Sequence, residues 1–86
     1  MLLVVCQSEH LDELATRFVV PLVRPGAEFD QITRLNPVFR VASGEWLFFP
    51  QLAASVPVTQ LGEVVGSLSD ERDAIVRALD ILLTGF

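Results

Sequence analysis

Residues 69–86 read SDERDAIVRALDILLTGF, and this stretch has the strongest secondary-structure signal in the chain. Its apolar residues recur every three or four positions and therefore line one face of a helix; they are Ala74, Ile75, Ala78, Leu79 and Leu82. Ser69 can cap the helix, and the two acidic residues after it suit the positive end of the helix dipole. Gly85 is a C-terminal helix breaker. The pattern predicts an amphipathic helix over about residues 70–83.

Upstream of this helix, short runs rich in β-branched, aromatic and other apolar residues predict strands. They lie at about residues 2–6, 17–22, 37–41 and 45–49, with a shorter, interrupted extended segment at 52–58. The third and fourth runs flank Ala42-Ser43-Gly44, a spacing typical of a hairpin. Pro21 lacks an amide hydrogen, which predicts an edge or a bulge for its strand. Residues 1–86 are therefore expected to form one α+β domain, a strand-rich body followed by one helix.

The chain is unusually apolar for its size. Of its 86 residues 51% are hydrophobic, and its mean hydropathy is +0.50. A domain this small has a thin core, so part of the apolar surplus is expected to face a partner. The alternative is a monomer with an unusually apolar core.

Charge and cysteine content exclude several classes of protein. The net charge is −5, and the six basic residues, all arginine, are scattered along the chain, so direct nucleic-acid binding is disfavoured. Cys6 is the single cysteine, which excludes an intramolecular disulfide and a cysteine zinc cluster. No segment approaches the ~20 apolar residues of a membrane span. A cytoplasmic location fits best.

The residues that could perform catalysis are few. His10 is the only histidine and stands beside Glu9 and Asp12. Such a group can act as a general base or bind a metal, but a solvated surface histidine is the favoured interpretation. Phosphate-binding loops, zinc motifs and nucleophile elbows are missing from the sequence. We expect no catalytic residue, no metal and no cofactor.

Two aromatic features remain. Strand alternation places Trp46 and Phe48 on one face and Phe49 on the other. For all three aromatic residues, a place in the core or in a dimer interface is favoured over a ligand-binding surface. The terminal Phe86 can bury its ring in its own chain, in a twin subunit or in a partner, which would gain roughly 1.5–3 kcal/mol. Composition leaves these three alternatives open.

Several motifs resemble those of the CcdB toxins, over nearly the whole chain. In the C-terminal half these are Ala54-Ser55-Val56-Pro57-Val58, Leu61-Gly62-Glu63, Leu68-Ser69 and a helix that runs into Gly85-Phe86. In the N-terminal half they are Val5-x-Gln7-Ser8 and Arg17-x-Val19-x-Pro21-Leu22, with one residue missing between Leu22 and Pro37. The resemblance implies a small antiparallel barrel-like sheet of the SH3-like type shared with the MazF ribonucleases, plus one C-terminal helix. The family's first strand has no counterpart before Met1.

The resemblance also implies a function. CcdB proteins are homodimeric toxins of toxin–antitoxin modules associated with plasmid maintenance. They bind the A subunit of DNA gyrase and trap the enzyme on cleaved DNA, and a CcdA-like antitoxin neutralises them. The gyrase-binding positions correspond here to Asp80, Leu83, Thr84, Gly85 and Phe86. The expected dimer-interface residues are Trp46, Phe48, Leu82 and Phe86. The implied mechanism is binding, not catalysis.

Two residues depart from the family pattern at the expected gyrase contact: Thr84 replaces a tryptophan, and Asp80 replaces an asparagine. They leave a second hypothesis open, a degenerate relative that binds its antitoxin but not gyrase. A MazF-like ribonuclease is a minor alternative, because the chain lacks a basic RNA-binding groove.

Overall fold

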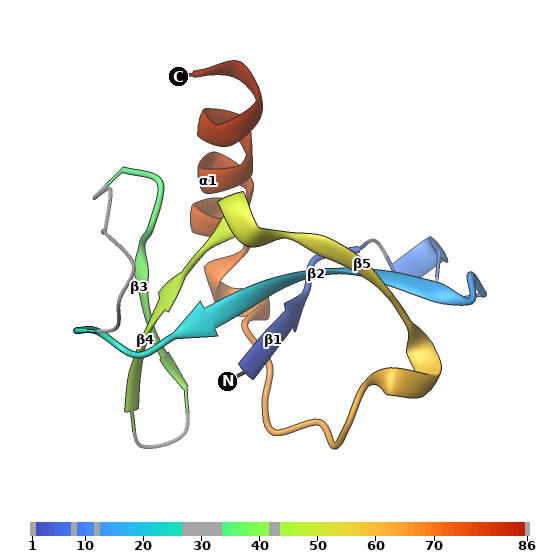
Figure 1. Ribbon diagram of the computed structural model, residues 1–86. Helices are drawn as coiled ribbons and strands as arrows, with labels where there is room; N and C mark the ends of the chain where they lie inside the picture. Colours follow the sequence, from blue (N-terminus) through green and yellow to red (C-terminus); the bar gives the residue numbers. More distant parts are fainter. Residues whose placement is uncertain (1, 8, 12, 27–33, 42–43, 86) are drawn as a thin grey trace.

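The computed structural model of the protein describes residues 2–7, 9–11, 13–26, 34–41 and 44–85 (Figure 1). In this part of the chain the strands are β1 (Leu2–Val5), β2 (Thr16–Val23), β3 (Val38–Val41), β4 (Gly44–Phe48) and β5 (Ala54–Pro57). The α-helix is α1 (Arg72–Thr84), and short 3-10 turns are η1 (Glu9–Leu11), η2 (Pro50–Leu52), η3 (Val58–Gln60) and η4 (Ser69–Glu71).

The strands form one curled antiparallel sheet, a half-barrel, in the order β1-β2-β4-β3, with β5 also paired to β2. The long strand β2 organises the sheet because it pairs with three others. One side of it follows β1, with Val20 opposite Val4. On its other side, the first half pairs with β5 and the last two residues with β4. Figure 1 shows α1 behind this sheet. The expected α+β fold is confirmed, as is the hairpin of β3 and β4.

Pro21 does not lie at an edge of the sheet, so the first of the two places expected from the sequence, an edge or a bulge, is wrong. It sits in the central strand β2, opposite Leu3 of β1. On its other side the pairing with β5 ends at Val19, and the pairing with β4 begins at Leu22. The Pro21 carbonyl accepts the amide hydrogen of Phe49 at 3.0 Å. Because both backbone groups of a residue point to the same side in an antiparallel strand, the missing amide hydrogen falls in this gap between the two partner strands.

The core has two parts, one on each face of the sheet. The cluster toward α1 contains Val20, Leu22, Phe39, Phe48 and Ala78. A second cluster contains Val23, Leu47 and Phe49. Phe48 and Phe49 therefore lie on opposite faces, as strand alternation predicts. Coverage of both faces also explains why the second half of β2 is buried without interruption.

A buried amide joins the hairpin to the turn beneath α1. Asn36, which has no exposed surface, donates from its side-chain nitrogen to the Phe48 carbonyl at 3.0 Å and to Gln51 Oε1 at 2.9 Å. Gln51 returns a hydrogen bond of 3.3 Å to Asn36 Oδ1. Since η2 contacts α1, this pair fixes the sheet, the turn and the helix relative to one another.

The start of the helix differs from the expectation. Ser69 lies in η4 and α1 begins at Arg72, after Glu71, whose side chain makes no capping hydrogen bond. The hydroxyl of Ser67 instead accepts the amide hydrogen of Ser69 at 3.2 Å. A 3-10 turn therefore supplies the first turn of the segment, a common arrangement at a helix N-terminus.

Candidate functional site

The last turn of α1 extends past the body of the protein. Before it, Ala74, Ile75, Ala78 and Leu79 pack against the core. Leu82 continues the same apolar stripe but is 39% exposed, and Leu83 is 78% exposed. Figure 1 shows the last turn of α1 rising beyond the strands. The apolar stripe is therefore longer than the core that it covers.

The helix ends with a tight change of direction. Gly85 adopts the left-handed conformation with φ of 82°, and its amide donates to the Ile81 carbonyl at 2.8 Å. Only glycine adopts this conformation without steric cost, so the residue is well suited to end the helix. The Thr84 hydroxyl donates to the Asp80 carbonyl at 2.6 Å. Phe86, expected to contact both gyrase and a second subunit, lies outside the described residues.

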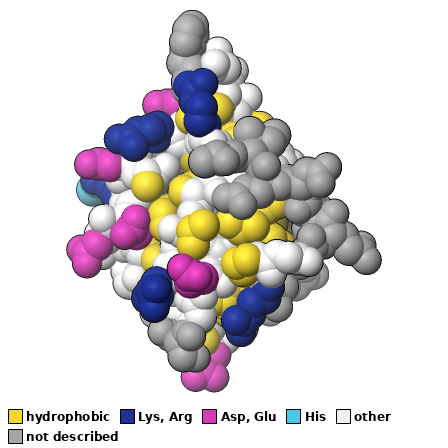
Figure 2. Space-filling model, turned by 90° about the vertical axis from the view of Figure 1, so that its left-hand side faces the viewer, with side chains coloured by type: hydrophobic (Ala, Val, Ile, Leu, Met, Phe, Trp, Pro, Cys, Tyr) yellow, Lys and Arg dark blue, Asp and Glu magenta, His cyan; other side chains and the backbone are white. Residues whose placement is uncertain are grey.

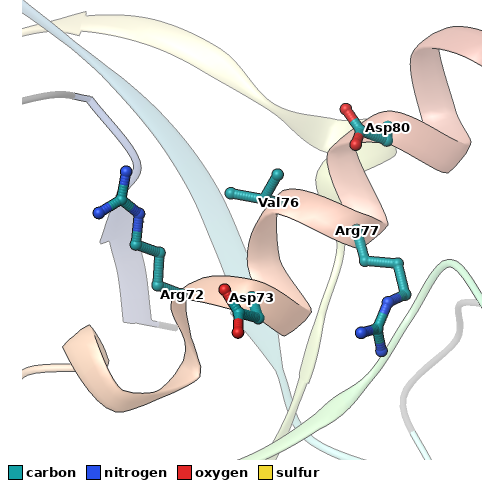
Figure 3. A pocket seen from close by; sticks show the side chains of 5 residues that line it. All are labelled: Arg72, Asp73, Val76, Arg77 and Asp80. Atoms are coloured by element: carbon teal, nitrogen blue, oxygen red, sulfur yellow. The ribbon is translucent and has the colours of Figure 1, made fainter.

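The outward face of α1 is charged rather than apolar. Arg72, Asp73, Val76, Arg77 and Asp80 line a shallow hollow of about 540 Å³ (Figure 3). In this view Arg77 extends away from Asp80, so the two side chains of opposite charge do not face each other. The most exposed apolar side chain of the helix is Leu83, while Val76 and Leu82 are partly exposed, at 47% and 39%.

Of the residues expected at a dimer interface, Phe48 belongs to the core. It has no exposed surface, and its ring lies 5.5 Å from that of Phe39 between centroids. Because Phe48 has no exposed surface, a second subunit cannot contact it, and the expectation that Phe48 lies in the dimer interface is wrong. Trp46 is half-buried against the same cluster, and the guanidinium of Arg24 lies over its ring, 4.3 Å from the centroid.

The family model for the CcdB protein matches residues 1–85. This chain belongs to the CcdB family. Its members are toxins of toxin–antitoxin modules, and the curled antiparallel sheet with one C-terminal helix is consistent with the CcdB fold. The expected gyrase-binding residues Asp80, Leu83, Thr84 and Gly85 are thus brought together on the last turns of α1 in a CcdB-family chain.

The two potentially reactive side chains considered in this CcdB-family chain are Cys6 and His10. Cys6 is half-buried, its thiol lies 3.6 Å from the Val4 carbonyl, and burial raises its pKa to about 11. The thiol therefore stays protonated and unreactive near neutral pH. His10 is exposed in η1. Among the described residues, no group of three or more histidine, cysteine or acidic side chains is arranged to hold a metal ion. No described helix is long and apolar enough to cross a membrane.

Sequence reasoning missed two features of this CcdB-family chain. The burial of Asn36 has no sequence signature, because amide side chains are usually exposed. The contact between Arg24 and Trp46 joins residues that are far apart in sequence.

Figure 2 shows the molecule from the left-hand side of Figure 1, the side of β3 and β4, where apolar side chains are bordered by arginine and acidic side chains.

Proposed function

We propose that this CcdB-family protein binds and poisons DNA gyrase, through the A subunit, with the exposed end of α1. The observation that supports this proposal is the exposed last turn, where Leu83 is 78% exposed while the first half of the helix is anchored in the core. A rigid helix with an apolar end suits insertion into a partner, because little conformational entropy is lost on binding. The action is non-covalent, which fits a family that works by binding.

Leu83 is the described residue whose apolar side chain we expect to insert into gyrase. Complete burial of a leucine side chain contributes about 1.5–3 kcal/mol. Gly85 would let the chain turn closely against the partner, because it presents no side chain and already adopts a left-handed conformation. Asp80, one helical turn before Thr84, adds a carboxylate that requires a donor or a cation on the gyrase surface.

We also propose that the protein is a homodimer and that a CcdA-like antitoxin covers the same end of α1. Leu82 is 39% exposed next to the core-facing stripe, so a second copy can extend the apolar contact. Trp46 remains the other candidate for this interface, and Phe86 is retained as a proposal from the family. An antitoxin that covers Leu82 and Leu83 would remove the surface that gyrase needs.

One observation favours the alternative of a relative that binds its antitoxin but not gyrase. Thr84 stands where gyrase poisons of the family have a tryptophan, and its hydroxyl is engaged by the Asp80 carbonyl of its own helix. A central aromatic anchor often contributes 2 kcal/mol or more, which is about thirtyfold in affinity. Burial of Leu83 and Phe86 would have to offset that loss.

Expression in bacterial cells distinguishes these alternatives, with growth, gyrase-linked DNA and RNA integrity measured in the same culture. The wild type should stop growth and accumulate gyrase–DNA complexes. Leu83→Ser should remove both effects, because it replaces the exposed apolar side chain with a polar one. Val64→Ser is the matched control: Val64 is 85% exposed, lies outside α1, and should tolerate the change without effect.

Three results would contradict the proposal. Harmless wild-type expression with tight antitoxin binding would establish the degenerate relative. RNA decay without gyrase trapping would establish a MazF-like ribonuclease. Equal trapping by the wild type and by Leu83→Ser would exclude the end of α1 as the gyrase contact.

A further inference from the structure

A second surface of the molecule presents two cations away from α1. Arg24 and Pro25, just after β2, face the end of β3 and the start of β4 across a shallow hollow of about 450 Å³. From the hairpin, Arg40, Gly44 and Glu45 complete the lining. In a chain with net charge −5 and six basic residues, two arginines on one hollow are a local concentration of positive charge.

Arg24 is held in place without being neutralised. Its guanidinium lies over the Trp46 ring, with Cζ 4.3 Å from the centroid, a cation–π contact that holds the group beside the indole. Within the part of the chain that the structure describes, no oxygen atom accepts a hydrogen bond from Arg24, although the side chain carries five N–H donors. An ordered guanidinium with open donors binds an anion at low entropic cost, because its orientation is already set.

Gly44 makes this arrangement possible. A Cβ atom on Gly44 would lie 2.8 Å from Arg24 Nη1 and 3.4 Å from the Trp46 indole nitrogen. Any side chain there would push against the guanidinium and shift it from its position over the ring. The residue therefore leaves room for the contact at the edge of the hollow.

The second cation is weakly paired. Arg40 Nη2 lies 3.7 Å from Glu45 Oε2, and both side chains are largely exposed, at 78% and 59%. Exposed pairs of this length contribute little and exchange readily for another partner. Arg40 is thus available to a second carboxylate, at the cost of releasing Glu45.

We propose that the hollow between Arg24 and Arg40 binds carboxylate side chains of an acidic peptide segment from a partner protein. A planar guanidinium with free donor edges matches a carboxylate in two parallel hydrogen bonds. A nucleic acid is the less suitable ligand, because phosphate chains need a continuous track of cations and this chain is acidic overall. The inference goes beyond the proposed gyrase binding and does not depend on it, but it requires the side of Trp46 that Arg24 covers to lie outside the homodimer interface.

The probe is a fluorescein-labelled hexaglutamate peptide, titrated with the full chain and followed by anisotropy. Trp46 is the only tryptophan and the chain has no tyrosine, so its emission reports directly on the Arg24 contact. We expect saturable binding that weakens with added salt, a change in Trp46 emission, and no binding of labelled hexaglutamine.

The variants test the two cations separately. Arg24→Gln should weaken binding about tenfold, the equivalent of 1.4 kcal/mol, and Arg24→Lys should lose part of the affinity because an ammonium group cannot form the paired contact. Glu45→Gln should strengthen binding, since it frees Arg40 and removes a competing charge. Arg72→Gln, with the same loss of charge at the start of α1, is the control and should stay within about twofold, an energy difference under 0.5 kcal/mol.

The proposal is overturned if hexaglutamate fails to bind, or if Arg72→Gln weakens binding as much as Arg24→Gln. It is also overturned if a labelled oligothymidylate binds more tightly than hexaglutamate at the same salt concentration. Glu45→Gln keeps the test decisive even where Arg24→Gln destabilises the fold, because this substitution is at an exposed position and predicts a gain.

Discussion

Replacement of the buried Asn36 by alanine should be among the most damaging single polar substitutions in the protein. The side chain has no exposed surface and makes hydrogen bonds to the Phe48 carbonyl and to Gln51. Loss of a partner for a buried carbonyl costs about 1–3 kcal/mol, and loss of the amide pair adds about 0.5–1.5 kcal/mol. We therefore expect Asn36→Ala to lower the free energy of unfolding by about 2–4 kcal/mol.

Urea unfolding followed by Trp46 fluorescence measures this loss, at one fixed protein concentration because association also stabilises a fold. Each 1 kcal/mol should lower the melting temperature by about 4–8 °C in a domain of this size. Gln51→Ala should cost less than Asn36→Ala, since Gln51 is exposed and water can replace its partner. Gln60→Ala removes an exposed amide from η3 and should change stability by less than about 0.5 kcal/mol. A cost below that level for Asn36→Ala would refute the role given to this buried amide.

Three further substitutions or reactions follow from the same contacts. Ala78→Leu inserts extra methylene groups where α1 meets the sheet, and should destabilise by about 1–3 kcal/mol in the same urea experiment; an unchanged midpoint would contradict close packing there. Gly85→Ala forces a side chain into the left-handed region, and should cost about 1 kcal/mol in thermal unfolding; a stabilised variant would contradict the observed helix end. The Cys6 thiol, whose pKa burial raises to about 11, should alkylate slowly at neutral pH and faster only as the pH approaches that value, as iodoacetamide labelling read by mass spectrometry will show; rapid labelling at pH 7 would contradict its burial.

The elements that the sequence predicts well are those determined by local periodicity. The spacing of Ala74, Ile75, Ala78 and Leu79 shows both that a helix forms and which face it buries, because each helical turn repeats the same geometry. Alternation along the predicted strand 45–49 likewise indicates that Phe48 and Phe49 point to opposite faces, as they do. The start of the helix is less well predicted, because a 3-10 turn takes up the amides of Glu71 and Arg72 that a capping Ser69 side chain would bind.

The features that the sequence does not predict depend on which segments become neighbours. Pro21 is tolerated in a central strand because two different strands meet beside it, which no local pattern shows. Alternation places Trp46 and Phe48 on one face but does not say what covers it, and the structure divides them between a surface under Arg24 and the core. The end of α1 is predicted as a binding surface by the family resemblance, and the apolar stripe that continues to Leu82 agrees with it, since Leu82 is partly exposed.

The most direct test of the central claim, that the end of α1 is a binding surface, is the affinity of the purified protein for the purified A subunit of gyrase. Wild-type protein and Val64→Ser should bind equally. Leu83→Ser should bind at least about tenfold more weakly, the equivalent of 1.4 kcal/mol of lost apolar contact. Equal binding by all three proteins, each shown to be folded by circular dichroism, would contradict the claim.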